Sequence, residues 1–130
     1  MNWKSLGAAL VSLSATLTAV AANHTKDTPA DVKKAVEDDK AVIIDVRELS
    51  EWNDGHLKNA KHLPLSELKA GAAEDKLKKL LPQGKIVYLH CASGMRCLKA
   101  ADLLKAAGYE SRPLKPGFEE LVSEGFIKAN

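Results

Sequence analysis

The sequence predicts an α/β protein in which helices flank a parallel sheet. Two apolar runs, 41–46 and 86–89, have the length and composition of buried strands. The first run is apolar at successive positions until Asp45, as expected of a strand that helices cover on both faces. Stretches with helical periodicity separate the candidate strands, and this alternation is typical of βαβ units.

The first element is a helix with a clear start. Thr28 supplies a hydroxyl cap, Pro29 stands at the first helical position, and Asp31 places an acid in the first turn. Apolar residues then recur at helical spacing up to Asp38, where we expect the helix to end. The strand at 41–46 follows directly.

Glycines and prolines separate the later elements. A helical turn ends at Gly55, and Pro64 stops the short strand that follows it. Gly84 precedes the second buried strand, and Gly108 lies just past the longest helix. The elements that we expect after the first strand are a helical turn at 49–53, a strand at 61–63, helices at 66–70 and 74–81, a strand at 86–89, a helix at 95–107, a strand at 110–114 and a helix at 118–123.

The first 21 residues have the pattern of a signal peptide. Lys4 precedes an uncharged stretch, 6–20, and Ala19 and Ala21 place small residues where a signal peptidase cuts. A membrane anchor is the alternative, but this stretch has about 15 residues, whereas a spanning helix needs roughly 20. We therefore expect cleavage after Ala21, with the bond after Ala22 nearly as favourable, and a single domain at 22–130.

Export and charge limit the expected partners. The mature protein is expected in the periplasm, or outside the cell where there is no outer membrane, without stable membrane association. The chain has 19 Lys and Arg against 17 Asp and Glu, and these charges form no basic block. This balance does not favour nucleic-acid binding.

The candidate nucleophile is Cys91, which stands between the strand at 86–89 and the helix at 95–107. A cysteine in that position lies at the positive end of the helix dipole, and unpaired loop amides can converge on it. Such surroundings favour the thiolate, which is the nucleophilic form. The alternative is a buried cysteine that only packs.

The loop that follows Cys91 has the residues that an anion site needs. Gly94 permits backbone conformations that are closed to other residues. The small side chains of Ala92 and Ser93 are expected to keep the mouth of the loop open. Arg96 adds a planar, permanently charged group that suits an oxyanion of sulfur or phosphorus, the alternative being a solvated helix residue.

Four segments of the chain form a series in a specific order. They are Ile44-Asp45-Val46-Arg47-Glu48, the stretch from Glu51-Trp52 through Gly55-His56-Leu57 to Pro64, Cys91 to Arg96 with Ala100-Ala101, and Lys115-Pro116-Gly117-Phe118. In order and spacing this series resembles the rhodanese family over nearly the whole predicted domain. The resemblance implies a three-layer fold with a central, mostly parallel five-stranded sheet flanked by helices.

The same resemblance implies a sulfurtransferase. Cys91 would take sulfur from thiosulfate or a similar small anionic donor and hold it as a persulfide. It would then pass the sulfur to cyanide, a small thiol or a protein thiol. Arg96, with Arg47, would attract the donor. The residues whose amides would cradle the sulfur are Ala92, Ser93, Gly94, Met95 and Arg96.

Supporting residues are expected around this loop. The resemblance places Asp45, Arg47 and His56 in neighbouring loops, where we expect scaffolding rather than chemistry. Cys97 stands where the family commonly has a small hydroxyl residue. It is either a packed residue in place of serine or a resolving thiol that attacks oxidised Cys91 to form a disulfide.

Other functions stay open at this point. A thiol–disulfide redox protein would use the pair Cys91 and Cys97, and a non-catalytic module would only bind a partner. The intact cysteine, Gly94 and Arg96 argue against the binding module. Phosphate or arsenate chemistry is disfavoured. The resemblance implies that family members with those substrates have an active loop that is one residue longer than this one. A shorter loop suits a single sulfur atom.

No cofactor and no metal are expected. The chain has four histidines without the spacing of metal ligands. We expect each of them to be exposed or hydrogen-bonded. They are His24, His56, His62 and His90.

Overall fold

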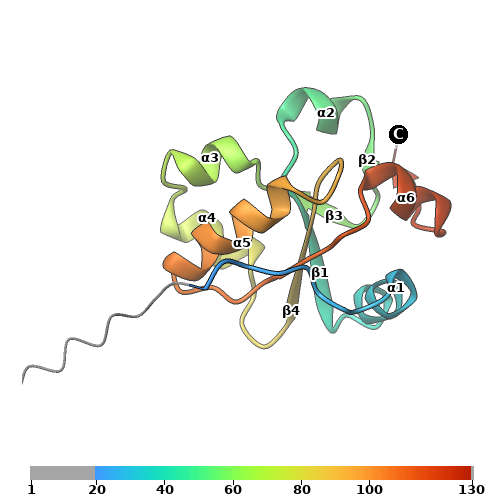
Figure 1. Ribbon diagram of the computed structural model, residues 1–130, viewed down its shortest axis with the longest axis horizontal. Coiled ribbons are helices and arrows are strands. Elements are labelled where there is room, and N and C mark those ends of the chain that lie inside the picture. Colours follow the sequence, from blue (N-terminus) through green and yellow to red (C-terminus); the bar gives the residue numbers. More distant parts are fainter. Residues whose placement is uncertain (1–19, 130) are drawn as a thin grey trace, which may run out of the picture.

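The structure, a computed structural model that describes residues 20–129, places a parallel sheet between two layers of helices (Figure 1). The predicted signal peptide, 1–21, lies outside the described residues apart from its last two positions, so its cleavage stays a prediction. Among residues 20–129, no helix is both long enough and apolar enough to span a membrane.

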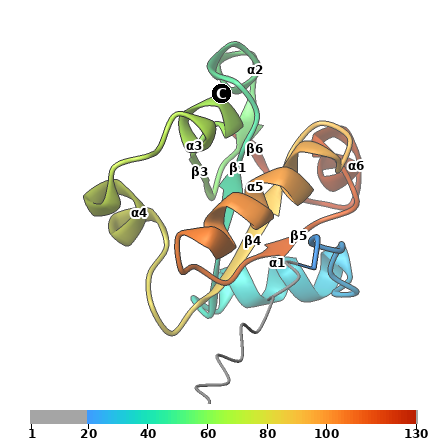
Figure 2. The same ribbon diagram turned by 60° about the vertical axis from the view of Figure 1, so that its left-hand side comes forward.

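Helices cover both faces of the sheet. Within the described residues they are α1 (Pro29–Glu37), α2 (Leu49–Asn53), α3 (Leu65–Lys69), α4 (Glu74–Leu80), α5 (Arg96–Ala106) and α6 (Phe118–Ser123). Figure 1 shows α3, α4 and α5 on one side of the sheet, and α1 and α6 on the other. Figure 2 shows the same separation from a second direction.

The main sheet has parallel strands in the order β3-β1-β4-β5. The two buried runs of the sequence form its centre, as predicted. The α/β fold class, with a parallel sheet flanked by helices, is therefore confirmed. The strands are β1 (Ala41–Asp45), β3 (Ala60–His62), β4 (Ile86–His90) and β5 (Arg112–Pro113).

The expected count of five strands is wrong, since this sheet has four within residues 20–129. The strand predicted at 110–114 is shorter in the structure, where β5 has only two residues. Pro113 has no amide hydrogen to donate to a neighbouring strand. Outside β5, the segment before α1 makes a single backbone bond to that edge, from the Thr25 amide to the Pro113 carbonyl at 2.8 Å. A separate antiparallel pair, β2 (His56–Leu57) with β6 (Lys128–Ala129), was not predicted.

Successive side chains of β1 enter two different hydrophobic clusters. Ile44 packs in the cluster that includes Leu68 of α3 and Leu104 of α5. Ile43 packs in the cluster that includes Val32 of α1 and Leu121 of α6. Because strand side chains alternate, a strand that is apolar at every position supplies both layers.

The helix α1 begins as its sequence predicts. The Thr28 hydroxyl accepts the Asp31 amide at 3.1 Å, and the Asp31 carboxylate accepts the Thr28 amide at 3.1 Å. This reciprocal cap satisfies two amides that the first helical turn leaves unpaired. The chain before Thr28 is thereby fixed in direction as it enters the helix.

The carboxyl ends of β1 and β4 lie side by side, because Asp45 pairs with His90 in the parallel register. The Val46 amide also donates to the His90 carbonyl at 3.0 Å. The segments that leave the two strands therefore start at one edge of the sheet. This is the edge at which sites form in parallel α/β sheets.

Candidate active site

The loop between β4 and α5 carries Cys91 at its start. Gly94, in the middle of the loop, has a backbone φ of 85°, which favours glycine because other residues are strained there. A β-carbon at this position would also overlap the Lys115 carbonyl oxygen. The loop then enters α5, whose first residue is Arg96.

The Cys91 sulfur faces the inside of this loop. Its Sγ accepts the Gly94 amide at 3.1 Å. The adjacent Cys97 thiol, together with the amides of Cys97, Ser93 and Gly94, lowers the pKa of Cys91 to about 5, although burial acts in the opposite direction. The thiolate is therefore the main form of Cys91 at neutral pH.

The expected cradle is present in part. The Gly94 amide donates to the sulfur, and the amides of Ser93 and Cys97 contribute to its lowered pKa. In the described part of the chain, the amides of Ala92, Met95 and Arg96 are not among the sulfur's donors. Sequence reasoning could identify the loop but not the amides that its backbone turns inward.

The expectation of an open loop mouth is wrong. Cys91 has no exposed surface, although Ala92 and Ser93 are exposed. The small side chains point away from the protein while the backbone of the loop closes over the sulfur. A donor can reach the thiolate only when the loop shifts.

Arg96 extends from the first turn of α5 to Glu51 of α2. Its two terminal nitrogens donate to the two Glu51 carboxylate oxygens at 2.6 and 2.8 Å. The hydrogen bonds from Arg96 lower the pKa of Glu51 to about 2, and Glu51 in turn raises the pKa of Arg96. The Cys91 thiolate also raises the pKa of Arg96, so the guanidinium lies within the electrostatic reach of the sulfur.

Arg47 binds groups of its own protein and does not offer a free charge to a donor. Its side chain is 6% exposed and donates to the buried Asp45 carboxylate through Nε at 3.1 Å and Nη2 at 2.9 Å. Nη2 also donates to the Gly55 carbonyl at 2.8 Å. The guanidinium lies 4.1 Å from the centre of the Phe118 ring. The prediction that Arg47 helps to attract the donor therefore has no geometric support.

His56 belongs to a stack beside this scaffold. Its ring lies parallel to that of Trp52, with centroids 3.6 Å apart, and His62 lies on Trp52 at 4.8 Å. The Nδ1 of His56 bonds to the Trp52 carbonyl at 3.0 Å, and the Nε2 of His62 bonds to the Arg47 carbonyl at 2.7 Å. Both histidines therefore bond to the backbone of neighbouring segments, and the scaffolding role of His56 stays a prediction.

The turn before α6 presses on the Cys91 loop from outside. A β-carbon at Gly117 would overlap the Ala92 carbonyl oxygen, so only glycine fits this contact. The Phe118 amide donates to the Cys91 carbonyl at 2.9 Å. The closing turn therefore fixes the start of the loop.

Cys97 is a buried, free thiol at the base of the loop. Its Sγ lies within hydrogen-bonding distance of the Gly94 carbonyl at 3.1 Å and of the Leu114 carbonyl at 3.2 Å. The interaction with Cys91, together with burial, raises the pKa of Cys97. Cys97 thus keeps its proton while Cys91 loses one.

His90 departs from the expectation that each histidine is exposed or hydrogen-bonded. It has no exposed surface, and within residues 20–129 neither ring nitrogen has a hydrogen-bond partner. Burial lowers the pKa of His90 to about 4, although the Asp45 carboxylate, 3.6 Å from Nε2, opposes this shift. The ring directly before the nucleophile is therefore neutral at neutral pH.

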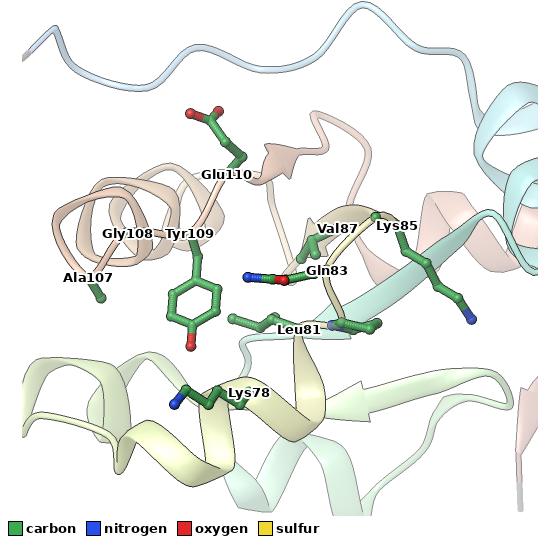
Figure 3. Close-up of a pocket in the computed structure, with 11 residues that line it drawn as sticks. Lys78, Leu81, Gln83, Lys85, Val87, Ala107, Gly108, Tyr109 and Glu110 are labelled. Atoms are coloured by element: carbon green, nitrogen blue, oxygen red, sulfur yellow. The ribbon is translucent and has the colours of Figure 1, made fainter.

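A large surface hollow lies away from Cys91. It has a volume of about 630 Å³, and its lining includes Gln83, Val87 and Tyr109 (Figure 3). These residues stand near the start of β4 and just past the end of α5, at the opposite end of the sheet. No group of three or more potential metal ligands occurs among residues 20–129.

The fold agrees with comparisons to known proteins. The Rhodanese-like domain family matches residues 28–124, so the chain belongs to this family. The chain is 27% identical to the rhodanese-like domain of an Anabaena sp. protein, whose solution NMR structure superposes with a TM-score of 0.64. That similarity covers 78% of this chain and 76% of the Anabaena chain.

Two curated relatives come from Bacillus subtilis (strain 168). The uncharacterized protein YqhL is 39% identical over 82 residues, which are 62% of this chain and 60% of YqhL. The putative sulfur carrier protein YrkF is 33% identical over 79 residues, which are 60% of this chain and 40% of YrkF. The matched stretch is thus 60% of the first relative and less of the second.

Proposed function

We propose that this protein is a sulfurtransferase that carries sulfane sulfur as a persulfide on Cys91. The observation that carries the proposal is the thiolate held by the Gly94 amide on a six-residue loop at the start of α5. A sulfur anion with a low pKa is nucleophilic at neutral pH and is also a good site for a second sulfur. Family membership and the relative named as a putative sulfur carrier support the same chemistry.

The reaction runs in two displacements. The Cys91 thiolate attacks the outer sulfur of thiosulfate, a sulfur–sulfur bond forms, and sulfite leaves with the electron pair of the broken bond. A thiophilic acceptor, such as cyanide or a thiolate, then attacks the outer sulfur of the persulfide. This step restores the Cys91 thiolate, which the Gly94 amide stabilises at both ends of the cycle.

Arg96 is the residue that we assign to the approach of the anionic donor. It is the guanidinium whose charge reaches the sulfur, and its side chain is 32% exposed, whereas that of Arg47 is 6% exposed and bound to the buried Asp45 carboxylate. The ion pair with Glu51 holds the fork of Arg96 in place but offsets part of its charge. Small anionic donors fit this site better than nucleic acids, for which the surface offers no basic block.

Intact mass spectrometry after incubation with thiosulfate tests the persulfide. The wild-type protein should gain one sulfur atom that peptide mapping locates on Cys91, and Cys91→Ser should gain none. Cys97→Ser is the matched control, because it removes the neighbouring thiol and keeps the nucleophile, so it should still gain the atom. A sulfur gain in Cys91→Ser, or no gain in the wild-type protein, would exclude the mechanism.

A second candidate function is a thiol–disulfide couple of Cys91 and Cys97. The adjacent positions of the two free thiols and their opposite pKa shifts favour it, because redox pairs combine a nucleophilic thiolate with a protonated partner. Peroxide would convert the Cys91 thiolate to a sulfenate. Cys97 would then attack that sulfur, form the disulfide and release the oxygen as hydroxide or water.

Free-thiol counting before and after peroxide separates the two functions. A redox couple predicts that both thiols disappear together in the wild-type protein, and that Cys97→Ser stops at sulfenate on Cys91. Sulfur transfer predicts that Cys97→Ser retains thiosulfate turnover. If the Cys97 thiol persists through oxidation of Cys91, the redox couple is excluded.

We further propose that the chain is exported and cleaved after Ala21, to act in the periplasm, or outside the cell where there is no outer membrane, without stable membrane attachment. The proposal is supported by the contact of the next residue. The Ala22 backbone nitrogen donates to the Asp102 carboxylate of α5 at 2.8 Å. Cleavage would turn that nitrogen into an ammonium group, and charge-assisted bonds are about twice as strong as neutral ones.

The mass of the protein recovered from the periplasmic fraction tests this processing. A mature chain that starts at Ala22 is the expected result. Asp102→Asn should then lower the thermal midpoint of the processed chain more than that of the unprocessed chain, because only the former has the ammonium. Recovery of a chain that still starts at Met1, confined to the cytoplasmic fraction, would contradict export.

A further inference from the structure

The segment that precedes α1 lies across the molecule and reaches the Cys91 loop. Figure 1 shows this segment running from the side of α5 to α1, beside the chain that contains β5. The Thr25 amide binds the Pro113 carbonyl at 2.8 Å. The Asp27 carboxylate accepts the Tyr88 hydroxyl at 2.7 Å and Arg112 Nη1 at 2.8 Å. We call residues 22–27 the N-terminal strap.

His24 joins this strap to the active loop. Its Nε2 lies 2.6 Å from the Gly94 carbonyl oxygen. A carbonyl oxygen only accepts, so His24 must carry a hydrogen on Nε2 and donate it. The contact is half-buried, and the strap is tied on both sides of it, at Ala22 and at Thr25.

Gly94 is also the residue whose amide holds the nucleophile. Its N–H points to the Cys91 sulfur at 3.1 Å, while its carbonyl receives His24. The Cys97 Sγ also lies 3.1 Å from this carbonyl, so His24 is one of two side chains that fix its direction. A hydrogen bond to the carbonyl therefore limits the direction of the amide on the same residue.

We propose that His24 is a positioning residue for Cys91, acting through the Gly94 backbone. It holds the Gly94 carbonyl so that the Gly94 amide stays aimed at the sulfur. The residue lies before 28–124, the stretch that matches the family. The inference deepens the proposed function, yet it concerns the thiolate itself and can be tested without a sulfur donor.

The test is the pH dependence of Cys91 alkylation by iodoacetamide in three variants. His24→Ala should lower the alkylation rate at pH 5, taken relative to the same variant's rate at neutral pH, by about threefold to fivefold, which corresponds to a pKa rise of about 0.7 to 1 unit. His24→Gln keeps a donor on a side chain of similar reach and should recover most of the rate. Lys26→Ala is the matched control, because it alters an exposed strap residue that does not touch the loop, and it should match the wild-type protein.

Thermal unfolding of each variant separates positioning from simple loss of stability. A His24→Ala profile that coincides with the wild-type profile would overturn the proposal. Equal shifts in His24→Ala and His24→Gln would also overturn it, because the donor would then have no part. Alkylation needs no persulfide, so failure of sulfur loading in the wild-type protein would reject the proposed function and leave this result intact.

Discussion

At the scale of single residues, the Cys91 thiolate is the feature with the most direct consequence. Its pKa of about 5, against an ordinary value of 9.0, predicts that alkylation by iodoacetamide rises with pH to a midpoint near 5 and is then level through neutral pH. Cys97 is the largest contributor to this shift. We therefore expect the midpoint to move upward in Cys97→Ala and to move less in Cys97→Ser, whose hydroxyl can still donate.

The measurement is the alkylation rate from pH 4 upward, where His90 and Cys91 begin to titrate. Cys91→Ser gives the background from Cys97 and should be slow through neutral pH, because burial still opposes ionisation of that thiol and shields it from the reagent. A wild-type midpoint near the ordinary value of 9.0 would show that the amides and Cys97 do not stabilise the thiolate.

Residue types predicted the nucleophile but not its partners. The position of Cys91 between strand and helix identified it, because both elements have clear sequence signals. Glu51 and His24 reach the loop from segments 40 and more residues away, and no local pattern connects them to it. These contacts depend on how α2 and the strap pack near the Cys91 loop. The spacing of residues in a single sequence does not predict such packing.

At the scale of elements, the turn before α6 controls the Cys91 loop by contact. Gly117→Ala adds a methyl group that overlaps the Ala92 carbonyl, so we expect a loss of about 1–3 kcal/mol in unfolding free energy. We also expect slower sulfur loading, because the backbone that must move belongs to the active loop. Urea denaturation and the loading assay together measure the two effects.

Gly71→Ala is the control for this substitution. Nothing lies within 4 Å of a β-carbon at Gly71, so its cost comes only from a backbone φ of 85°. It should lower stability, by about 1–2 kcal/mol for the left-handed backbone, and leave sulfur loading unchanged. If both variants load sulfur at the wild-type rate, the contact at Gly117 does not constrain the loop.

Elements with strong local signals were predicted well, and short ones were not. The cap of Thr28 and Asp31 placed the start of α1, and apolar runs placed β1 and β4. The pair β2 and β6 has only two residues in each strand, too few for alternation to register in the sequence. The length of β5 depends on the backbone hydrogen bonds that it makes to neighbouring segments, and Pro113 has no amide hydrogen to donate to them.

At the scale of the whole molecule, the lowered pKa values of Cys91, His90 and Glu51 each make the unfolding free energy rise with pH. The unfolded chain binds protons that the folded chain does not bind when a pKa is lower in the folded state. The contribution of Cys91 is complete above its ordinary pKa of 9.0 and is lost as the pH falls toward about 5. That of His90 is lost between 6.5 and about 4, and that of Glu51 between 4.5 and about 2.

Chemical denaturation at a series of pH values measures the combined contribution of these groups to the unfolding free energy. The unfolding free energy should fall steadily as the pH is lowered from 9 toward 4, the range that Cys91 and His90 titrate. Cys91→Ser should flatten the upper part of the curve, and Cys91→Ser with His90→Leu should flatten the middle part as well. A wild-type curve that is level through this range would contradict the pKa shifts of both groups.

The overall architecture was predicted from the alternation of strands and helices, because each βαβ unit follows from local pattern and a short connection. What could not be predicted was how tightly the parts close around the site. Whether the mouth of the Cys91 loop is open depends on the contact between Gly117 and the Ala92 carbonyl, which forms only in the folded chain.

The absence of exposed surface at Cys91 bears on the rate of the first step of the proposed persulfide cycle. A sulfur donor reaches the Cys91 Sγ only through motion of the loop, so we expect loading to be gated by backbone motion instead of by donor reactivity. At saturating concentrations, thiosulfate and an organic thiosulfonate should then share one limiting rate of sulfur loading. Two different plateaus would mean that the gate opens faster than the chemistry proceeds.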